Sequence, residues 1–174
     1  MNDLLINIHL DLGITTEHLK SNCLSLQEQP RLEDLKVVDI DFEGKPFILL
    51  STAAKAWIDM RDEAQRADIY LMPFSGFRSY LYQKSLIDRH LKNGRLLESI
   101  LTHIAIPVFS EHHSGRSIDI HANGKAVLEE EFENTVEFKW LMENASYYKF
   151  RLSYPKSNSY GIIYEPWHWF YIGD

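Results

Sequence analysis

The chain has 174 residues, of which 45% are hydrophobic and 25% are charged, the composition of an ordinary globular protein. This length suits one well-buried core and is short for two domains. The formal net charge is −7, and no run of Lys or Arg stands out. We therefore expect no nucleic-acid partner, because phosphate binding needs a concentrated positive surface.

The N-terminal residues differ from a signal peptide, which needs a positive start followed by an unbroken apolar stretch. No apolar segment approaches the roughly 20 residues that span a bilayer, so we expect no transmembrane segment. As written, the sequence predicts a cytoplasmic protein; a periplasmic or extracellular location is the alternative if a leader was removed. The sequence indicates no particular oligomeric state.

Cys23 is the only cysteine, which excludes an intramolecular disulfide and a thiolate zinc site. Any bound metal must therefore have nitrogen and oxygen ligands. We expect Cys23 to be a small core residue without a catalytic function.

Residues 1–34 carry little pattern, although residues 15–18 can open a short helix. Apolar and polar residues alternate over 38–43, and an apolar run over 47–50 follows, which predicts a hairpin. Ser51 or Thr52 can cap a helix that continues to about residue 67. The apolar face expected for this helix consists of Ala53, Ala56, Trp57, Met60 and Ala64.

The next segment predicts a short buried strand over 69–74, a turn over 75–79 and a helix that ends at Gly94. A second helical stretch over 95–104 precedes Pro107. Further along, residues 117–121 alternate like a strand. The spacing of Phe138, Leu141, Met142 and Ala145 then predicts a helix.

Residues 160–171 are rich in aromatic and β-branched side chains and predict a strand pair. Strands and helices are intermixed without regular βαβ repetition, so the expected fold class is α+β. We expect residues 1–49 to be an N-terminal extension, packed on or continuous with a functional domain over 50–174.

Two distant segments together predict a zinc site. A catalytic zinc needs three protein ligands, an open position for water and a carboxylate that takes a proton from that water. His112, Asp119 and His168 are the candidate ligands, and Glu165 is the candidate base. Pro166 makes a helix interior improbable there and favours a stiff extended or turn segment.

Each of these residues also has an ordinary structural interpretation. His168 between two tryptophans can be a core histidine, Asp119 within a strand can be a paired structural acid, and His112 can be exposed. His121 shares a strand face with Asp119 and is the main rival ligand. His113 is free to contact substrate or solvent. The remaining histidines are interpreted as structural or surface residues: His9, His18, His90 and His103.

Arg78 lies in the predicted turn between a strand and a helix. A guanidinium there can hold a substrate carboxylate or stabilise an oxyanion. The alternative is a surface arginine beside a turn.

Taken together and in this order, three segments resemble the VanY-type D-alanyl-D-alanine carboxypeptidases, a family related to lysostaphin-type peptidases and the hedgehog zinc domain. The segments are Ser-Gly-Phe-Arg-Ser at 75–79 with Gln83 after it, Ser-x-His-x-x-Gly-x-x-x-Asp at 110–119, and Glu-Pro-Trp-His-Trp at 165–169. The resemblance covers about residues 50–171. Phe77 replaces a common Tyr, and Ser117 replaces a small apolar residue, but no ligand position is lost.

The resemblance implies a small antiparallel sheet that carries the zinc site, with helices packed against it. It implies zinc bound by His112, Asp119 and His168, with Glu165 as the general base. Arg78 would stabilise charge or hold the substrate, with Ser110 and Gln83 nearby as substrate-binding residues.

The implied enzyme is a zinc metallopeptidase that removes the C-terminal D-alanine from a peptidoglycan stem peptide or precursor, with D,D or L,D specificity left open. One alternative is a peptidoglycan endopeptidase of the phage-lysin type. The other is a non-catalytic zinc-containing binding module, against which a retained Glu165 argues.

Overall fold

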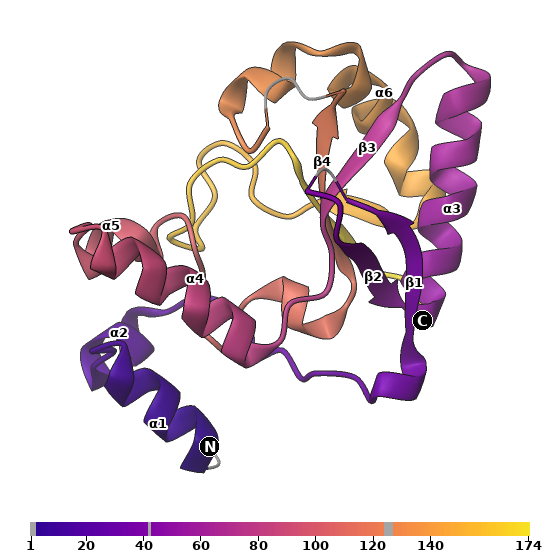
Figure 1. The fold of residues 1–174 in the computed structure, drawn as a ribbon. Coiled ribbons are helices and arrows are strands. Elements are labelled where there is room, and N and C mark those ends of the chain that lie inside the picture. Colours follow the sequence, from indigo (N-terminus) through magenta and orange to yellow (C-terminus); the bar gives the residue numbers. More distant parts are fainter. Residues whose placement is uncertain (1–2, 42, 124–126) are drawn as a thin grey trace.

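The fold is built around two antiparallel sheets, as the computed structural model shows for residues 3–41, 43–123 and 127–174 (Figure 1). The smaller sheet is the hairpin β1-β2, and the larger has the strand order β3-β4-β6-β5. The strand bounds are β1 Leu35–Ile40, β2 Pro46–Leu50, β3 Leu71–Ser75, β4 Ser117–Ala122, β5 Phe150–Leu152 and β6 His168–Tyr171. All three strand pairs of the larger sheet are antiparallel.

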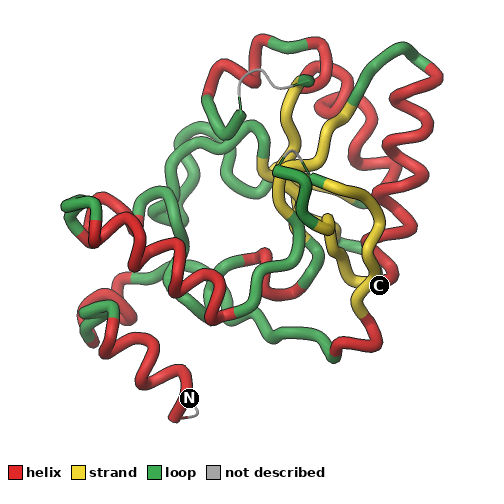
Figure 2. Tube along the Cα trace, in the orientation of Figure 1, coloured by secondary structure: helices red, strands yellow, loops and turns green. Residues whose placement is uncertain are grey.

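Helices lie on two sides of these sheets (Figure 2). The α-helices are α1 Asp3–Asp11, α2 Thr16–Ser21, α3 Ser51–Arg66, α4 Tyr80–Lys92, α5 Leu97–Leu101 and α6 Val136–Asn144. Short 3-10 turns are η1 Leu32–Asp34, η2 Glu111–Ser114, η3 Glu130–Asn134 and η4 Ala145–Tyr148. In Figure 1, α3 runs along one side of the sheets, while α1, α2, α4 and α5 form a group on the other side.

Two apolar clusters correspond to these two groups. The larger joins α3 and α6 to the sheets and includes Trp57, Ile118 and Leu141, all fully buried. The smaller joins α1 to α4 and α5 through residues such as Ile8 and Ile87. Because burial of a large apolar side chain stabilises by about 1.5–3 kcal/mol, these clusters hold the two helical groups firmly.

Most of the expected elements are present. The hairpin, the helices α3 and α6 and the strand β4 form where the hydrophobic pattern predicts them, and the α+β class with a small antiparallel sheet is confirmed. Thr15 caps α2 through a capping box with His18. Gly94 follows α4 with a φ of 80°, a left-handed conformation that favours glycine.

Several expectations about the elements are wrong. Residues 160–167 do not pair as a strand: the backbone N–H groups of Ile163 and Glu165 donate to loop carbonyls, and only β6 joins the sheet. The Ser51 hydroxyl donates to the Asp34 carbonyl instead of capping α3. Cys23 is exposed, and Met142 is 57% exposed, so neither belongs to the core.

Other differences concern length. The helical stretch expected over 95–104 is shortened to α5, and α1 forms in a region where the sequence carries little pattern. Of the expected α3 face, Ala56 is half-buried while the other four side chains are fully buried. In the described part of the chain, no helix is long and apolar enough to cross a membrane.

Candidate metal centre

The register of the larger sheet places three polar side chains side by side. Ser75 on β3 pairs with Asp119 on β4, and Asp119 pairs with His168 on β6. Asp119 therefore lies on the central strand, with one neighbour from a segment 44 positions before it and one 49 positions after it. Alternation along β4 turns this carboxylate to one face of the sheet.

His112 reaches this face from η2. Its Nδ1 donates to the carbonyl of Gly76 at 2.7 Å, which leaves Nε2 free as a metal-binding atom and aims it at Asp119. Gly76 is required by packing, because a Cβ there would lie 2.3 Å from the Ile48 carbonyl oxygen. Gly115 ends η2 with a φ of 69°, and its carbonyl accepts from the Leu50 amide.

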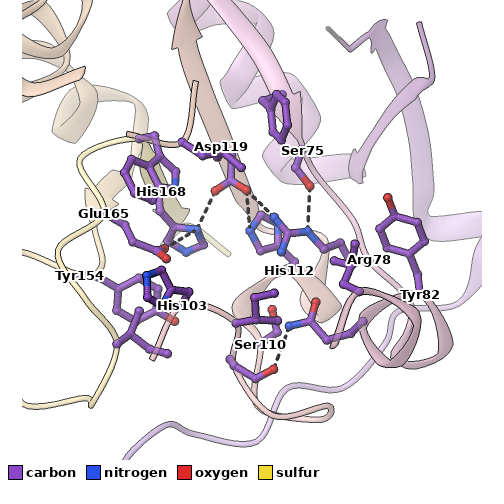
Figure 3. A pocket seen from close by; sticks show the side chains of 18 of the residues that line it. Ser75, Arg78, Tyr82, His103, Ser110, His112, Asp119, Tyr154, Glu165 and His168 are labelled. Carbon is purple, nitrogen blue, oxygen red and sulfur yellow. Dashed lines mark hydrogen bonds and ion pairs between the residues drawn. The ribbon is translucent and has the colours of Figure 1, made fainter. Parts of the chain in front are cut away.

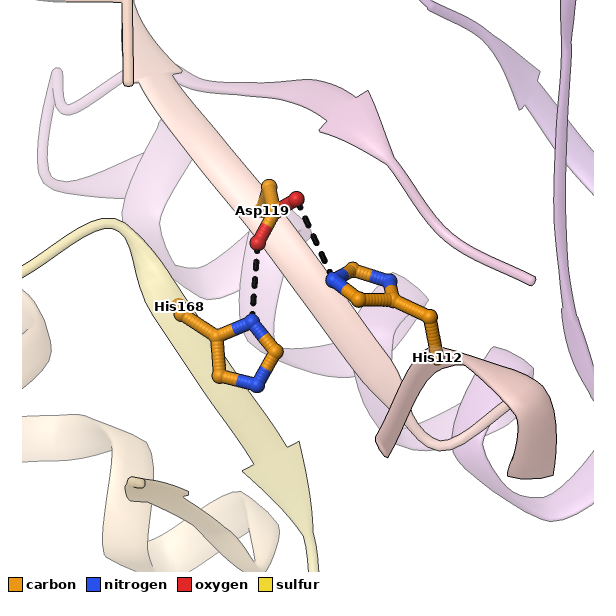
Figure 4. A group of neighbouring side chains, drawn as sticks. All are labelled: His112, Asp119 and His168. Atoms are coloured by element: carbon orange, nitrogen blue, oxygen red, sulfur yellow. Dashed lines mark hydrogen bonds and ion pairs between the residues drawn. The ribbon is translucent and has the colours of Figure 1, made fainter. Parts of the chain in front are cut away.

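His112, Asp119 and His168 converge (Figure 4). Nε2 of His112 lies 3.2 Å from one Asp119 oxygen, and Nδ1 of His168 lies 2.9 Å from the other. One ligand atom from each residue lies within 4.8 Å of the other two, and all three residues are buried. Tetrahedral zinc separates its ligand atoms by about 3.4 Å, so this set fits a metal ion with small adjustments.

The second ring nitrogen of His168 has its own partner. Nε2 lies 2.9 Å from Oε2 of Glu111, and the other oxygen of Glu111 accepts from Arg151 at 3.0 Å. Tyr154 packs against the same imidazole, with ring centroids 4.9 Å apart. His168 is therefore fixed on both edges and one face.

Glu165 lies next to this group but outside it. Its Oε2 is 3.9 Å from Nδ1 of His168, and only 8% of the residue is exposed. The backbone holds it in place, since its N–H donates to the Tyr154 carbonyl and its own carbonyl accepts from the His168 amide. Its carboxylate therefore lies beside the three grouped residues without belonging to the group that could hold a metal.

Arg78 enters from the turn after β3. Its Nε donates to the Ser75 hydroxyl at 2.8 Å, and Nη2 donates to Asp119. The Arg78 amide also donates to the His112 carbonyl. The expected surface alternative for this arginine is wrong, because 15% of its side chain is exposed.

Most of these side chains line one cavity of about 370 Å³, whereas Glu111 and Arg151 lie outside its lining (Figure 3). Ser110 and Gln83 lie on its wall, as do the three grouped residues and Glu165. The Gln83 amide donates to the Ala105 carbonyl at 2.9 Å, while its Oε1 has no hydrogen-bond partner in the described part of the chain. That oxygen is itself buried, and the Gln83 side chain forms part of the cavity wall.

Burial and charge set the protonation of the group. Burial alone would raise the pKa of Asp119, but His112, Arg78 and His168 hold it well below its usual range. Burial, followed by the charge of Arg78, lowers the pKa of His112 to about 4. Burial also raises the pKa of Glu165 to about 8, against the lowering effect of His168.

His168 responds differently because carboxylates lie on both sides of its ring. Burial favours the neutral imidazole, but the hydrogen bonds to Asp119 and Glu111 outweigh it and raise the pKa to about 10. A cation is therefore favoured between these carboxylates, and a bound metal ion can take the place of that proton.

Four other histidines lie near this site, two of them buried and two on the wall of the cavity. His113 is fully buried and its Nδ1 donates to the Arg78 carbonyl, so the expected contact with substrate or solvent is wrong. His121 is buried on β4, two residues after Asp119, and lies outside the group that can hold a metal. His90 and His103, expected to be structural or surface residues, both line the cavity.

Sequence reasoning also missed Glu111 and Tyr154. Glu111 precedes His112 in the same motif, but its contact with His168 joins positions 57 apart. Tyr154 lies in a loop without any pattern that marks it. The position of this acid directly before the candidate ligand His112 was the signal that the sequence offered for Glu111.

A buried group of two histidines and an aspartate, with a separate carboxylate and an arginine in one cavity, is the arrangement of a metal-dependent hydrolase. Residues 47–174 match the family VanY: D-alanyl-D-alanine carboxypeptidase. The chain belongs to this family, and the resemblance inferred from the motifs is confirmed.

Individual relatives agree with the family. YodJ of Bacillus subtilis strain 168, whose name places it among the carboxypeptidases, is 35% identical over 150 residues. These residues are 80% of this chain and 54% of YodJ, so the chain spans about half the length of that relative.

Two solved structures share the fold. The LD-carboxypeptidase LdcB, in a structure concerned with peptidoglycan recognition, superposes with a TM-score of 0.73 at 32% identity, covering 83% of this chain and 70% of LdcB. A variant of the D,D-pentapeptidase VanY from a VanB-type resistance cassette, in complex with Zn(II), gives a TM-score of 0.64 at 24% identity, covering 88% and 89%.

Proposed function

We propose that the protein is a zinc-dependent carboxypeptidase that hydrolyses the C-terminal D-alanine of peptidoglycan stem peptides or precursors. The observation that carries this proposal is the buried group of His112, Asp119 and His168 with Glu165 beside it. Membership of the VanY family and the activities of LdcB and VanY support the substrate class.

His112, Asp119 and His168 would hold the zinc. Two imidazole nitrogens and one carboxylate suit zinc in a catalytic site, and they leave a position open. The Zn(II) complex of the related VanY supports this choice of metal. Bound there, zinc supplies Lewis acidity, which polarises a carbonyl and makes water acidic enough to attack at neutral pH.

Glu165 would act as the general base and acid. Its carboxylate takes the proton of the attacking water and later passes it to the amine of the departing D-alanine. Burial raises its pKa to about 8 without a metal, so the protonated form is accessible near neutral pH. The nearby zinc charge would lower that pKa and favour the base form at the start of the reaction.

Arg78 would offset the negative charge that develops on the scissile carbonyl oxygen, or hold the free carboxylate of the terminal residue. Its hydrogen bonds to Ser75 and Asp119 hold the guanidinium ready at the cavity wall. Gln83 and the buried Ser110 line this wall and would bind the substrate there.

The direct experiment incubates zinc-loaded protein with a pentapeptide ending in D-Ala-D-Ala and with the tetrapeptide that lacks the last residue. Mass spectrometry identifies the released fragment, and a chelator-treated sample is the control. Release of free D-alanine that requires metal supports the proposal, and the preferred peptide decides between D,D and L,D specificity. Cleavage within the peptide supports an endopeptidase, and zinc binding without cleavage supports a non-catalytic module.

A further inference from the structure

The cavity that contains the candidate metal centre also extends to a group of basic side chains. One face of α4 lines it, with Gln83 and Leu86 followed by Arg89 and His90. Arg95, after the end of α4, lines the same cavity. We call Arg89, His90 and Arg95 the basic cluster. His103 lies on the cavity wall as well and projects beside Tyr154 in the view of Figure 3.

The basic cluster is held together without a neutralising acid. Nη1 of Arg95 lies 3.3 Å from Nδ1 of His90, and both residues are half-buried. The turn that follows α4 fixes this contact, because the Arg95 amide donates to the His90 carbonyl. Burial, then the charges of Arg95 and Arg89, lower the pKa of His90, as expected for a locally positive environment.

The arginines of the cluster differ from most others in the chain. Among the described residues, neither Arg89 nor Arg95 has a carboxylate within ion-pair distance, whereas Arg61, Arg66 and Arg151 each contact one. In a protein with a net charge of −7, acids are plentiful, so two arginines left together beside a cavity indicate a place for an external anion.

Two acids line the same cavity outside the candidate metal centre, Asp41 and Glu43, and both have partners near their own turn. Glu43 pairs with Lys45, and the Asp41 carboxylate accepts from the backbone amides of its own turn. Neither contacts the basic cluster. The positive charge therefore remains available in the cavity.

The distance along α4 from Gln83 to the basic cluster indicates which part of a peptide substrate would reach the cluster. Seven residues separate Gln83 from His90, and an α-helix rises about 1.5 Å per residue, so the cluster lies about 10 Å along the helix from Gln83. An extended peptide covers this distance in about three residues. Arg78, which contacts Asp119, is the cation beside the candidate metal centre and suits the carboxylate of a single departing residue, which leaves the basic cluster for a group farther along the peptide.

We propose that Arg89, His90 and Arg95 form a subsite for a carboxylate carried by the substrate peptide about three residues before the scissile bond. The subsite rests on the proposed peptidase function and assigns to it a preference for acidic peptides. The guanidinium of Arg95 is the principal partner, because it is half-buried and held by His90.

The test uses acetylated peptides that end in D-Ala-D-Ala and carry either Glu or Gln at the third residue before the scissile bond. We expect the zinc-loaded protein to prefer the Glu peptide about tenfold in kcat/KM, the effect of one charge-assisted contact. Arg95→Gln should reduce this preference to about twofold or less by slowing the Glu peptide alone. Lys92→Gln, which removes an exposed charge from α4 outside the cavity, should leave it unchanged.

Two results would overturn the subsite: equal rates for both peptides with the unaltered protein, or an equal loss on both peptides in Arg95→Gln. If neither peptide is hydrolysed, the proposed function fails, and calorimetric Kd values for the two peptides then decide the subsite separately. Tighter binding of the Glu peptide that disappears in Arg95→Gln supports it, and equal binding contradicts it.

Discussion

Glu111 binds the edge of His168 that faces away from Asp119, with Oε2 of Glu111 2.9 Å from Nε2 of His168. This contact fixes which ring nitrogen of His168 faces Asp119 and the candidate metal position. Carboxylates that hold metal-ligating histidines in this way raise the basicity of the ligand and orient its ring. Against the effect of burial, His168 and then Arg151 lower the pKa of Glu111, and the contact of Arg151 with the other oxygen holds the carboxylate in place.

Glu111→Gln should therefore weaken zinc binding by about 10–100-fold, because the amide can still contact His168 but no longer carries the charge. Competition with a chromogenic chelator measures the Kd. The exposed Glu143→Gln on α6 is the matched control and should bind zinc as the unaltered protein does. Unchanged affinity in Glu111→Gln would show that the carboxylate has no influence on the ligand.

Two single substitutions test whether His168 or His121 is the metal ligand. His168→Gln should reduce zinc affinity by at least about 100-fold, since it removes one of three ligands. His121→Gln should change affinity by less than about threefold, because His121 lies outside the group that converges on Asp119. A large loss of zinc in His121→Gln, with a correctly folded protein by circular dichroism, would assign the ligand to β4 instead of β6.

His112, Asp119, Glu165 and His168 could be selected from the sequence because each lies in a compact motif, and the structure brings all four side chains to one cavity. Glu111 could not be assigned, because its partner His168 comes from another strand and only the sheet register brings them together. The position of His90 on the cavity wall could not be predicted for a similar reason, since the face of α4 that meets the cavity depends on packing against α1 and α5.

The segment 160–167 shows a second reason why the structure could not be predicted fully from the sequence. Its aromatic and β-branched residues favour a strand, yet Pro166 has no N–H to give to a ladder, and Ile163 donates to the Thr102 carbonyl. Tertiary contacts therefore decided its conformation. The same loop brings Glu165 to the cavity, so the departure from the sequence pattern occurs at the functional site.

His113 should make the metal-free protein sensitive to acid. Burial lowers its pKa to about 4, whereas an unfolded histidine titrates near 6.5, so the unfolded state binds more protons between these values. The contribution is present above pH 6.5 and is lost as the pH falls toward 4, a change of about 2–3 kcal/mol by pH 4.5.

His113→Phe keeps the edge contact with Tyr80 and removes the titrating group. Urea unfolding of metal-free samples at pH 7 and pH 4.5 should give a difference in unfolding free energy that is about 2–3 kcal/mol smaller in the variant. Comparing variant with parent cancels the other titrating groups. Parallel pH profiles for the two proteins would contradict the burial argument.

Gly76→Ala should destabilise the protein by about 1–3 kcal/mol, because the added Cβ would lie 2.3 Å from the Ile48 carbonyl oxygen. The displaced Gly76 carbonyl would also release His112, so zinc affinity should fall. Thermal unfolding and chelator competition measure the two effects. Gly161→Ala, at a φ of 80° in open space, is the control: it should cost about 1 kcal/mol and leave zinc affinity unchanged.

The separation of Glu165 from the three grouped residues is the central claim, and one measurement tests it most directly. Zinc content and the rate of D-alanine release are determined together for the unaltered protein and for Glu165→Gln. We predict one bound zinc in both proteins and a rate reduced by about 10²–10⁴-fold in the variant, the usual contribution of a general base. Loss of zinc together with activity would make Glu165 a ligand, and full activity with zinc retained would remove it from the mechanism.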